Sequence, residues 1–198
     1  MGNGLDNNWY LDGNNASVVS SDGNKTTVQM GSGYRGDLWL ARSGKGKIVN
    51  VTPADYRYFA IKVGFKSQLV PGKNKPNGCI KLEIFDDGIK KIGPEYFGTG
   101  GDANNRYEIL GASEISTTEP NVLYYDLQSK YKTVTPTDWN QVFDLVQCKF
   151  VIADFPETAQ TYDLYWIRSF KSIEELQAFV DLSVIHISEP TRLLSISY

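Results

Sequence analysis

The stretch that decides the fold is residues 56–65, YRYFAIKVGF, where large apolar side chains alternate with other residues. Phe59, Ile61, Val63 and Phe65 fall on one face of an extended chain, because successive side chains of a β-strand point to opposite sides. This period of two predicts a strand with one buried face.

Stretches of the same kind recur along the chain. They lie at residues 26–30, 37–40, 80–84, 105–112, 121–128, 141–155 and 161–170. Groups rich in Gly, Asn and Asp separate them, and such groups favour tight turns: 11–15, 21–24, 71–74, 86–88 and 98–102. About eight strands with short polar turns predict an all-β sandwich or barrel.

One short C-terminal helix is predicted after the last strand. Residues 172–175, Ser-Ile-Glu-Glu, have the spacing of a capping box, in which the first and last side chains satisfy free backbone N–H groups. Leu176, Phe179 and Val180 then recur at helical spacing. We expect the helix to close by residue 181 and to lay its apolar face against the sandwich.

The C-terminal segment differs in character from the rest. Residues 182–192, LSVIHISEPTR, resemble one translated frame of a sequencing adapter, with Val184 as the single mismatch. We therefore expect one domain over residues 1–181 and a non-native tail over 182–198. The alternative is a short C-terminal strand, since polar and apolar residues alternate loosely over 193–198.

Composition narrows the class of protein. The 198 residues are 41% hydrophobic and 22% charged, which is typical of a globular domain. A net charge of −3 gives no broad positive face for nucleic acid. No apolar run reaches the ~20 residues of a transmembrane helix, and no signal peptide is visible at the start.

Cysteine and histidine bear on chemistry. His186 is the single histidine and lies in the suspected tail, so the domain has no imidazole for a Ser-His-Asp triad or a His-ligated zinc site. Cys79 and Cys148 both fall in predicted strands. Two buried free thiols and a disulfide both remain open, because distance cannot be judged from sequence.

Three motifs resemble one family. They are YDLYWIRSFKSIEELQAF at 162–179, DYRYFAIKV at 55–63 and VLYYDL at 122–127. Over about residues 9–180 the chain resembles an uncharacterised domain family of secreted and outer-surface proteins of glycan-utilising gut bacteria. Such domains are similar to carbohydrate-binding modules of jelly-roll type. The resemblance implies a jelly-roll sandwich that binds polysaccharide or oligosaccharide, in a larger multidomain protein outside the cell or on its surface.

Candidate ligand-binding residues follow from sugar chemistry. An aromatic plane covers the C–H face of a sugar, and polar groups at its rim replace water hydrogen bonds. Trp39 falls on the polar phase of its strand with Asp37, and Trp139 follows a Pro-containing loop. These two are the first stacking candidates, with other aromatic residues and polar partners behind them: Tyr34, Tyr58, Tyr96, Arg35, Asp37, Lys62 and Asn140. The alternative for each aromatic residue is packing within the sandwich, which we expect for Trp166.

Other functions have less support in the sequence. A structural calcium ion is possible at residues 86–88 or 101–105, although such turns form without metal. No catalytic residue is predicted, and we expect no enzyme activity. A carboxylate-based glycosidase around residues 82–87 is a remote alternative, because the acidic spacing does not match. A spacer or protein-interaction module is a stronger alternative than a glycosidase. Such a module would show an exposed apolar patch in place of aromatic residues with polar neighbours.

Overall fold

The computed structural model describes the strands, several turns and one helix. The described residues are 10–12, 16–31, 35–42, 49–51, 57–66, 81–85, 97–98, 108–126, 143–145, 147–154 and 158–188. The described side chains are mainly those of residues 16–31, 57–66, 108–126 and 158–182.

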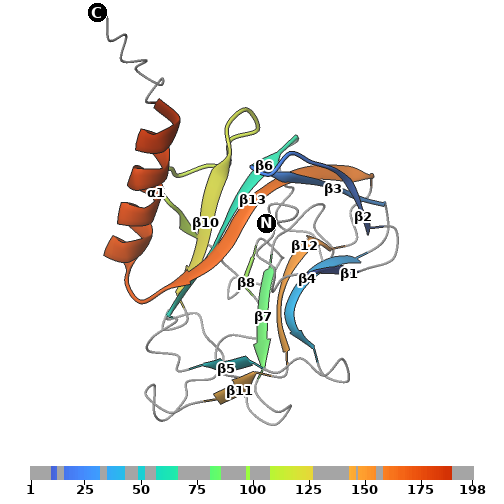
Figure 1. The fold of residues 1–198 in the computed structure, drawn as a ribbon. Helices are drawn as coiled ribbons and strands as arrows, with labels where there is room; N and C mark the ends of the chain where they lie inside the picture. The colour runs from blue at the N-terminus through green and yellow to red at the C-terminus, as the bar shows by residue number, and fades with distance from the viewer. Residues whose placement is uncertain are drawn as a thin grey trace, which may run out of the picture.

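Two antiparallel sheets form the body of the described fold (Figure 1). The six-stranded sheet has the order β2 (Ala16–Ser21), β3 (Thr26–Met30), β13 (Gln160–Phe170), β6 (Tyr58–Phe65), β10 (Asn121–Asp126), β9 (Glu108–Ile109). The five-stranded sheet has the order β1 (Tyr10–Asp12), β4 (Arg35–Arg42), β12 (Gln147–Asp154), β7 (Lys81–Phe85), β8 (Phe97–Gly98). Strands β5 (Val49–Val51) and β11 (Phe143–Leu145) pair separately. The predicted all-β sandwich is confirmed.

The order of the strands is that of a jelly roll. Strand β3 pairs with β13, β4 with β12, β6 with β10 and β7 with β8, all antiparallel. The chain therefore pairs from its ends inward, as one long hairpin would if it were wound into two sheets. Pairing of β13 with β6 then joins the β3–β13 and β6–β10 pairs in one sheet. Pairing of β12 with β7 joins the β4–β12 and β7–β8 pairs in the other. This nesting is the double Greek-key arrangement expected of the jelly-roll class.

The predicted strand face is the core. Phe59, Ile61, Val63 and Phe65 are at most 4% exposed, as their alternation requires. Their face of the six-stranded sheet turns toward the five-stranded sheet (Figure 1). The other buried apolar residues of this face come from the neighbouring strands: Val28, Met30, Leu123, Tyr125, Tyr162, Leu164 and Ile167.

Helix α1 (Ile173–Ser188) covers part of the opposite, outer face of the six-stranded sheet (Figure 1). Leu176 is fully buried against Ala60 of β6 and Val122 of β10. The capping box is confirmed in a shifted form, because Ser172 Oγ accepts the Glu175 N–H at 3.2 Å, whereas the Glu175 carboxylate accepts the N–H of Lys171 at 2.9 Å. Among the described residues, no helix combines the length and apolar character needed to cross a membrane.

Several boundaries differ from expectation. The helix continues to Ser188 and not to residue 181, because neither Gly nor Pro interrupts the chain until Pro190. Strand β2 was not predicted, since Val18 and Val19 are adjacent and exposed at the sheet edge, so no alternation marks it. Of the strand expected at 105–112, the described residues 108–112 form only β9 and a turn after it, and part of the turn expected at 11–15 belongs to β1. Residues 189–198, with the alternative C-terminal strand, lie outside the described residues.

Candidate functional site

The first candidate, Trp39, lies in β4, which has β1 on one side and β12 on the other in the five-stranded sheet. It is paired by register with Tyr10 of β1 and with Lys149 of β12. Lys149 is in turn opposite Glu83 of β7. Residues directly opposite one another in antiparallel strands share a face of the sheet. These four residues, which we name the Trp39 row, therefore form one line across four strands.

Asp37 occupies the next row on the same face. It is paired with Asp12 of β1 and Val151 of β12, two positions along from the Trp39 row. Arg35, at the start of β4, is opposite Asp154. Three predicted residues of β4, Arg35, Asp37 and Trp39, thus occupy alternate positions of the strand, which belong to one face of a sheet.

Other predicted residues fall outside the described parts of the chain. They are Tyr34, Tyr96, Trp139 and Asn140, together with the possible calcium loops at 86–88 and 101–105. Their roles stay predictions. Within the described ranges, no group of three or more His, Cys, Asp or Glu residues is arranged to hold a metal ion.

Tyr58 lies on the outer face of the six-stranded sheet and takes part in packing. The guanidinium of Arg57 lies 5.0 Å from the centre of its ring, and the ring of Tyr124 is 6.2 Å away at a tilted angle. Arg57 is held by a two-pronged ion pair, in which both N···O distances to Asp126 are 2.7 Å. Burial raises the pKa of the Tyr58 hydroxyl. These contacts give the ring a structural role, and its role in ligand binding stays a prediction.

Trp166 has the packing role expected of it, but it packs beneath α1 on the outer face of the six-stranded sheet and not within the sandwich. Its ring meets Phe179 of α1 edge-on at 5.2 Å and Phe170 edge-on at 6.4 Å. The guanidinium of Arg168 covers Phe179 at 4.6 Å from the ring centre. This aromatic group joins α1 to β13.

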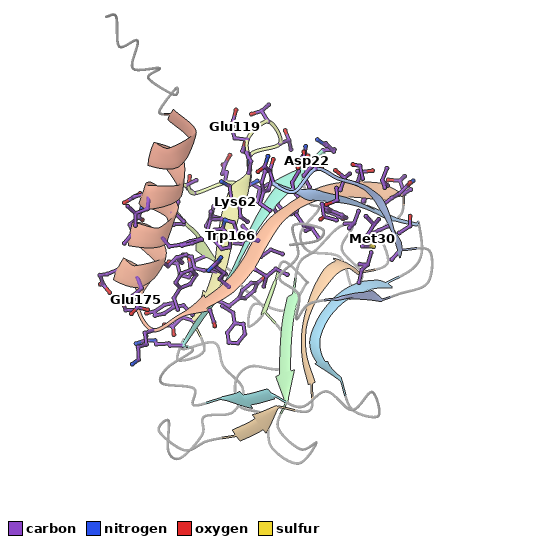
Figure 2. All side chains as sticks on the ribbon, in the orientation of Figure 1. Asp22, Met30, Lys62, Glu119, Trp166 and Glu175 are labelled. Atoms are coloured by element: carbon purple, nitrogen blue, oxygen red, sulfur yellow. The ribbon has the colours of Figure 1, made fainter. Side chains whose placement is uncertain are left out.

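A β-bulge separates the covered part of the outer face from a charged part. Leu164 pairs with Val63 and Trp166 with Lys62, so Tyr165 is the extra residue of the bulge. The Lys62 ammonium lies 5.4 Å from the centre of the Tyr165 ring, within the range of a cation–π contact. Figure 2 shows Lys62 and Trp166 on the side of the sheet that carries α1.

Asp163 is the buried centre of the charged part. Its Oδ1 accepts the Thr27 hydroxyl at 2.7 Å, while its Oδ2 accepts the ammonium groups of Lys25 at 2.9 Å and Lys66 at 3.1 Å. The side chain is only 7% exposed. Burial raises its pKa, but the hydrogen bonds from Thr27, Lys25 and Lys66 outweigh that effect and lower it to about 2. Asp163 is therefore an anion at every physiological pH.

Gly64 makes room for this carboxylate. It is directly opposite Asp163 in the register of β6 and β13. A Cβ at Gly64 would lie 3.3 Å from the Asp163 Cβ and 3.8 Å from the Tyr165 ring. Lys62 lies in β6 two positions before Gly64, and Lys66 lies two positions after it, directly beyond the end of β6 at Phe65.

We name this group the outer-face lysine cluster: Lys25, Lys62, Lys66, Asp163 and Tyr165. Sequence reasoning found only Lys62. Lys25 and Lys66 are 138 and 97 residues from Asp163, so no local pattern connects them. The signal that was available is the Lys-x-Gly-x-Lys spacing of residues 62–66, which places both lysines on the polar phase of the strand.

Comparison with known proteins gives a family and no curated relative. Residues 3–176 match the family described as a domain of unknown function (DUF4979), which covers all the described strands and the start of α1. No curated protein matches the chain. Because the match extends over far more than half of its length, the chain belongs to the DUF4979 family.

Proposed function

We propose that this domain binds polysaccharide or oligosaccharide chains without catalysis, as one module of a larger secreted or cell-surface protein. The observation that supports it most is the Trp39 row of the five-stranded sheet. In that row two aromatic residues, Tyr10 and Trp39, are neighbours, and Lys149 and Glu83 continue it.

This composition matches what sugars require. Aromatic rings remove the C–H faces of sugars from water, and ammonium and carboxylate groups beside them hydrogen-bond the hydroxyls at the edge. Strands in a sheet are about 4.8 Å apart, so four neighbouring positions extend over roughly 14 Å. A row of that length offers contacts to several consecutive sugars of an extended chain. The jelly-roll topology and the resemblance to carbohydrate-binding modules support the same class, and the resemblance alone supports the location outside the cell.

Affinity electrophoresis of the full chain tests the proposal. The chain is run through native gels that contain one soluble polysaccharide each, from a panel of plant and host glycans. We expect retardation on at least one glycan, and we expect Trp39→Ala to abolish retardation on neutral glycans. Trp166→Phe is the matched control, because it alters a tryptophan beneath α1 and keeps an aromatic ring there.

The outcomes separate function from site. Retardation on a neutral glycan that survives Trp39→Ala would keep carbohydrate binding and discard the Trp39 row. If a folded wild-type chain runs unretarded on every glycan, carbohydrate binding is refuted and a spacer module becomes the better account. Circular dichroism of each variant shows whether folding is intact.

A further inference from the structure

We infer that the outer-face lysine cluster binds the anionic groups, carboxylate or sulfate, of an acidic polysaccharide. This inference rests on the proposed function, since it names the class of glycan and adds a second binding face. That face is the part of the six-stranded sheet that lies beyond the aromatic packing of α1.

The cluster has more ammonium than carboxylate groups. Lys25 and Lys66 share a single oxygen, the Oδ2 of Asp163. Each ammonium has three N–H donors, and one shared acceptor cannot satisfy them all. The Lys66 side chain is 59% exposed and that of Lys25 is 35% exposed, so both reach solvent. An incoming anion therefore finds donors that are already positioned by the buried aspartate.

Lys62 adds a third ammonium group. In the described part of the chain it forms no ion pair with a carboxylate, and its ammonium group lies over the Tyr165 ring. One further acidic residue lies close to the cluster: Asp22, whose carboxylate accepts the backbone N–H groups of Asn24 and Lys25 at 2.9 Å each. Among the described residues, three ammonium groups thus lie near two carboxylates, an excess of one positive charge on a chain of net charge −3.

The arrangement suits a chain with repeated charges better than a single small anion. Lys62 lies in β6 and Lys66 directly follows the end of that strand, so four residues, or about 13 Å of extended chain, separate them. Gly64 adds no side chain between them. An extended chain lying along β6 would meet one ammonium group at each end and the Tyr165 ring between them. A sugar ring can pack on that aromatic ring, whereas an isolated anion would gain nothing from it.

Paired glycans that differ only in charge test the inference. The full chain is run in gels containing polygalacturonate or its methyl ester, and dextran sulfate or dextran. We expect retardation on an acidic member of a pair to exceed that on its neutral partner and to weaken with added salt. Exposed charge contacts are weak individually, so Lys62→Gln and Lys66→Gln should each weaken binding about two- to five-fold. The double variant should lose about ten-fold.

The control is Lys171→Gln, which removes the same charge from an exposed lysine at the start of α1 and should leave retardation unchanged. Lys62→Gln leaves the contacts of Asp163 intact, so its result does not depend on a change in folding. If only polygalacturonate retards the chain more than its neutral partner does, the ligand class is glycans with uronic acids. If only dextran sulfate does so, the ligand class is sulfated glycans.

Two results would overturn the inference. One is equal retardation on the charged and neutral member of both pairs, and the other is full acidic retardation of the double variant. In either case the proposed function would still hold if the wild-type chain is retarded on neutral glycans and Trp39→Ala abolishes that retardation. Absence of retardation on every glycan, charged or neutral, refutes the proposed function together with this inference.

Discussion

Asp163 offers the sharpest test of the packing described above. Asp163 is nearly buried and accepts hydrogen bonds from Thr27 in β3, from Lys25 directly before β3 and from Lys66 directly after β6, so Asp163→Asn removes a charge that these three donors stabilise. Its pKa falls from the ordinary 3.8 to about 2 in the folded chain. At about 1.4 kcal/mol per pKa unit, this drop corresponds to roughly 2 kcal/mol of folding free energy at neutral pH.

The pH dependence follows from the direction of that change. Since the folded-state pKa is the lower one, the stabilisation is complete above the unfolded pKa and is lost as the pH falls toward the folded pKa. Roughly half should disappear by pH 3 and most by pH 2. The gap in unfolding free energy between wild type and Asp163→Asn should therefore be about 2 kcal/mol at pH 7 and shrink steadily below pH 5.

Urea unfolding of both proteins at pH 7, 5, 4 and 3, followed by circular dichroism, measures this gap. Asp22→Asn is the matched control, since Asp22 is exposed and an asparagine oxygen can still accept the two turn N–H groups. It should unfold at nearly the wild-type urea concentration at pH 7. A gap below about 0.5 kcal/mol at pH 7, or one that does not change with pH, would refute the role assigned to the Asp163 ion pairs.

Substitutions at three further residues test other parts of the structure by urea unfolding at pH 7. Gly64→Val should cost about 1 to 3 kcal/mol, because even its Cβ would lie 3.3 Å from that of Asp163; an unchanged midpoint would contradict the tight contact. Phe179→Ala should cost about 2 kcal/mol by removing the edge-on contact with Trp166, and Phe179→Leu should recover part of this loss. Ser172→Ala should cost about 1 kcal/mol through loss of the helix cap, whereas Ser172→Asp should be close to neutral.

The fold was predictable where local alternation matches burial. Phe59, Ile61, Val63 and Phe65 form the core face that their spacing predicts, because one residue in two must point inward when a sheet has a second sheet on one side. Edge strand β2 was missed for the opposite reason. Val18 and Val19 remain exposed, so burial exerts no selection for alternation there.

The charged site was hardly predictable, because it depends on pairings over long distances. Asp163 acquires its partners only when β3 and β6 come to lie on either side of β13. The bulge that gives Tyr165 and Trp166 different neighbours is likewise a property of the pairing with β6 and not of the local sequence. For the Trp39 row, the polar phase of β4 was visible in the sequence, whereas its alignment with Tyr10 and Lys149 required the register.

The measurement that tests the central claim most directly is a titration of the full chain with the soluble glycan that retards it most, followed by tryptophan fluorescence. Carbohydrate binding predicts a saturable change in emission that is absent in Trp39→Phe and retained in Trp166→Phe. No saturable change with any glycan, from a wild-type chain that circular dichroism shows to be folded, would contradict the proposal that this domain binds carbohydrate.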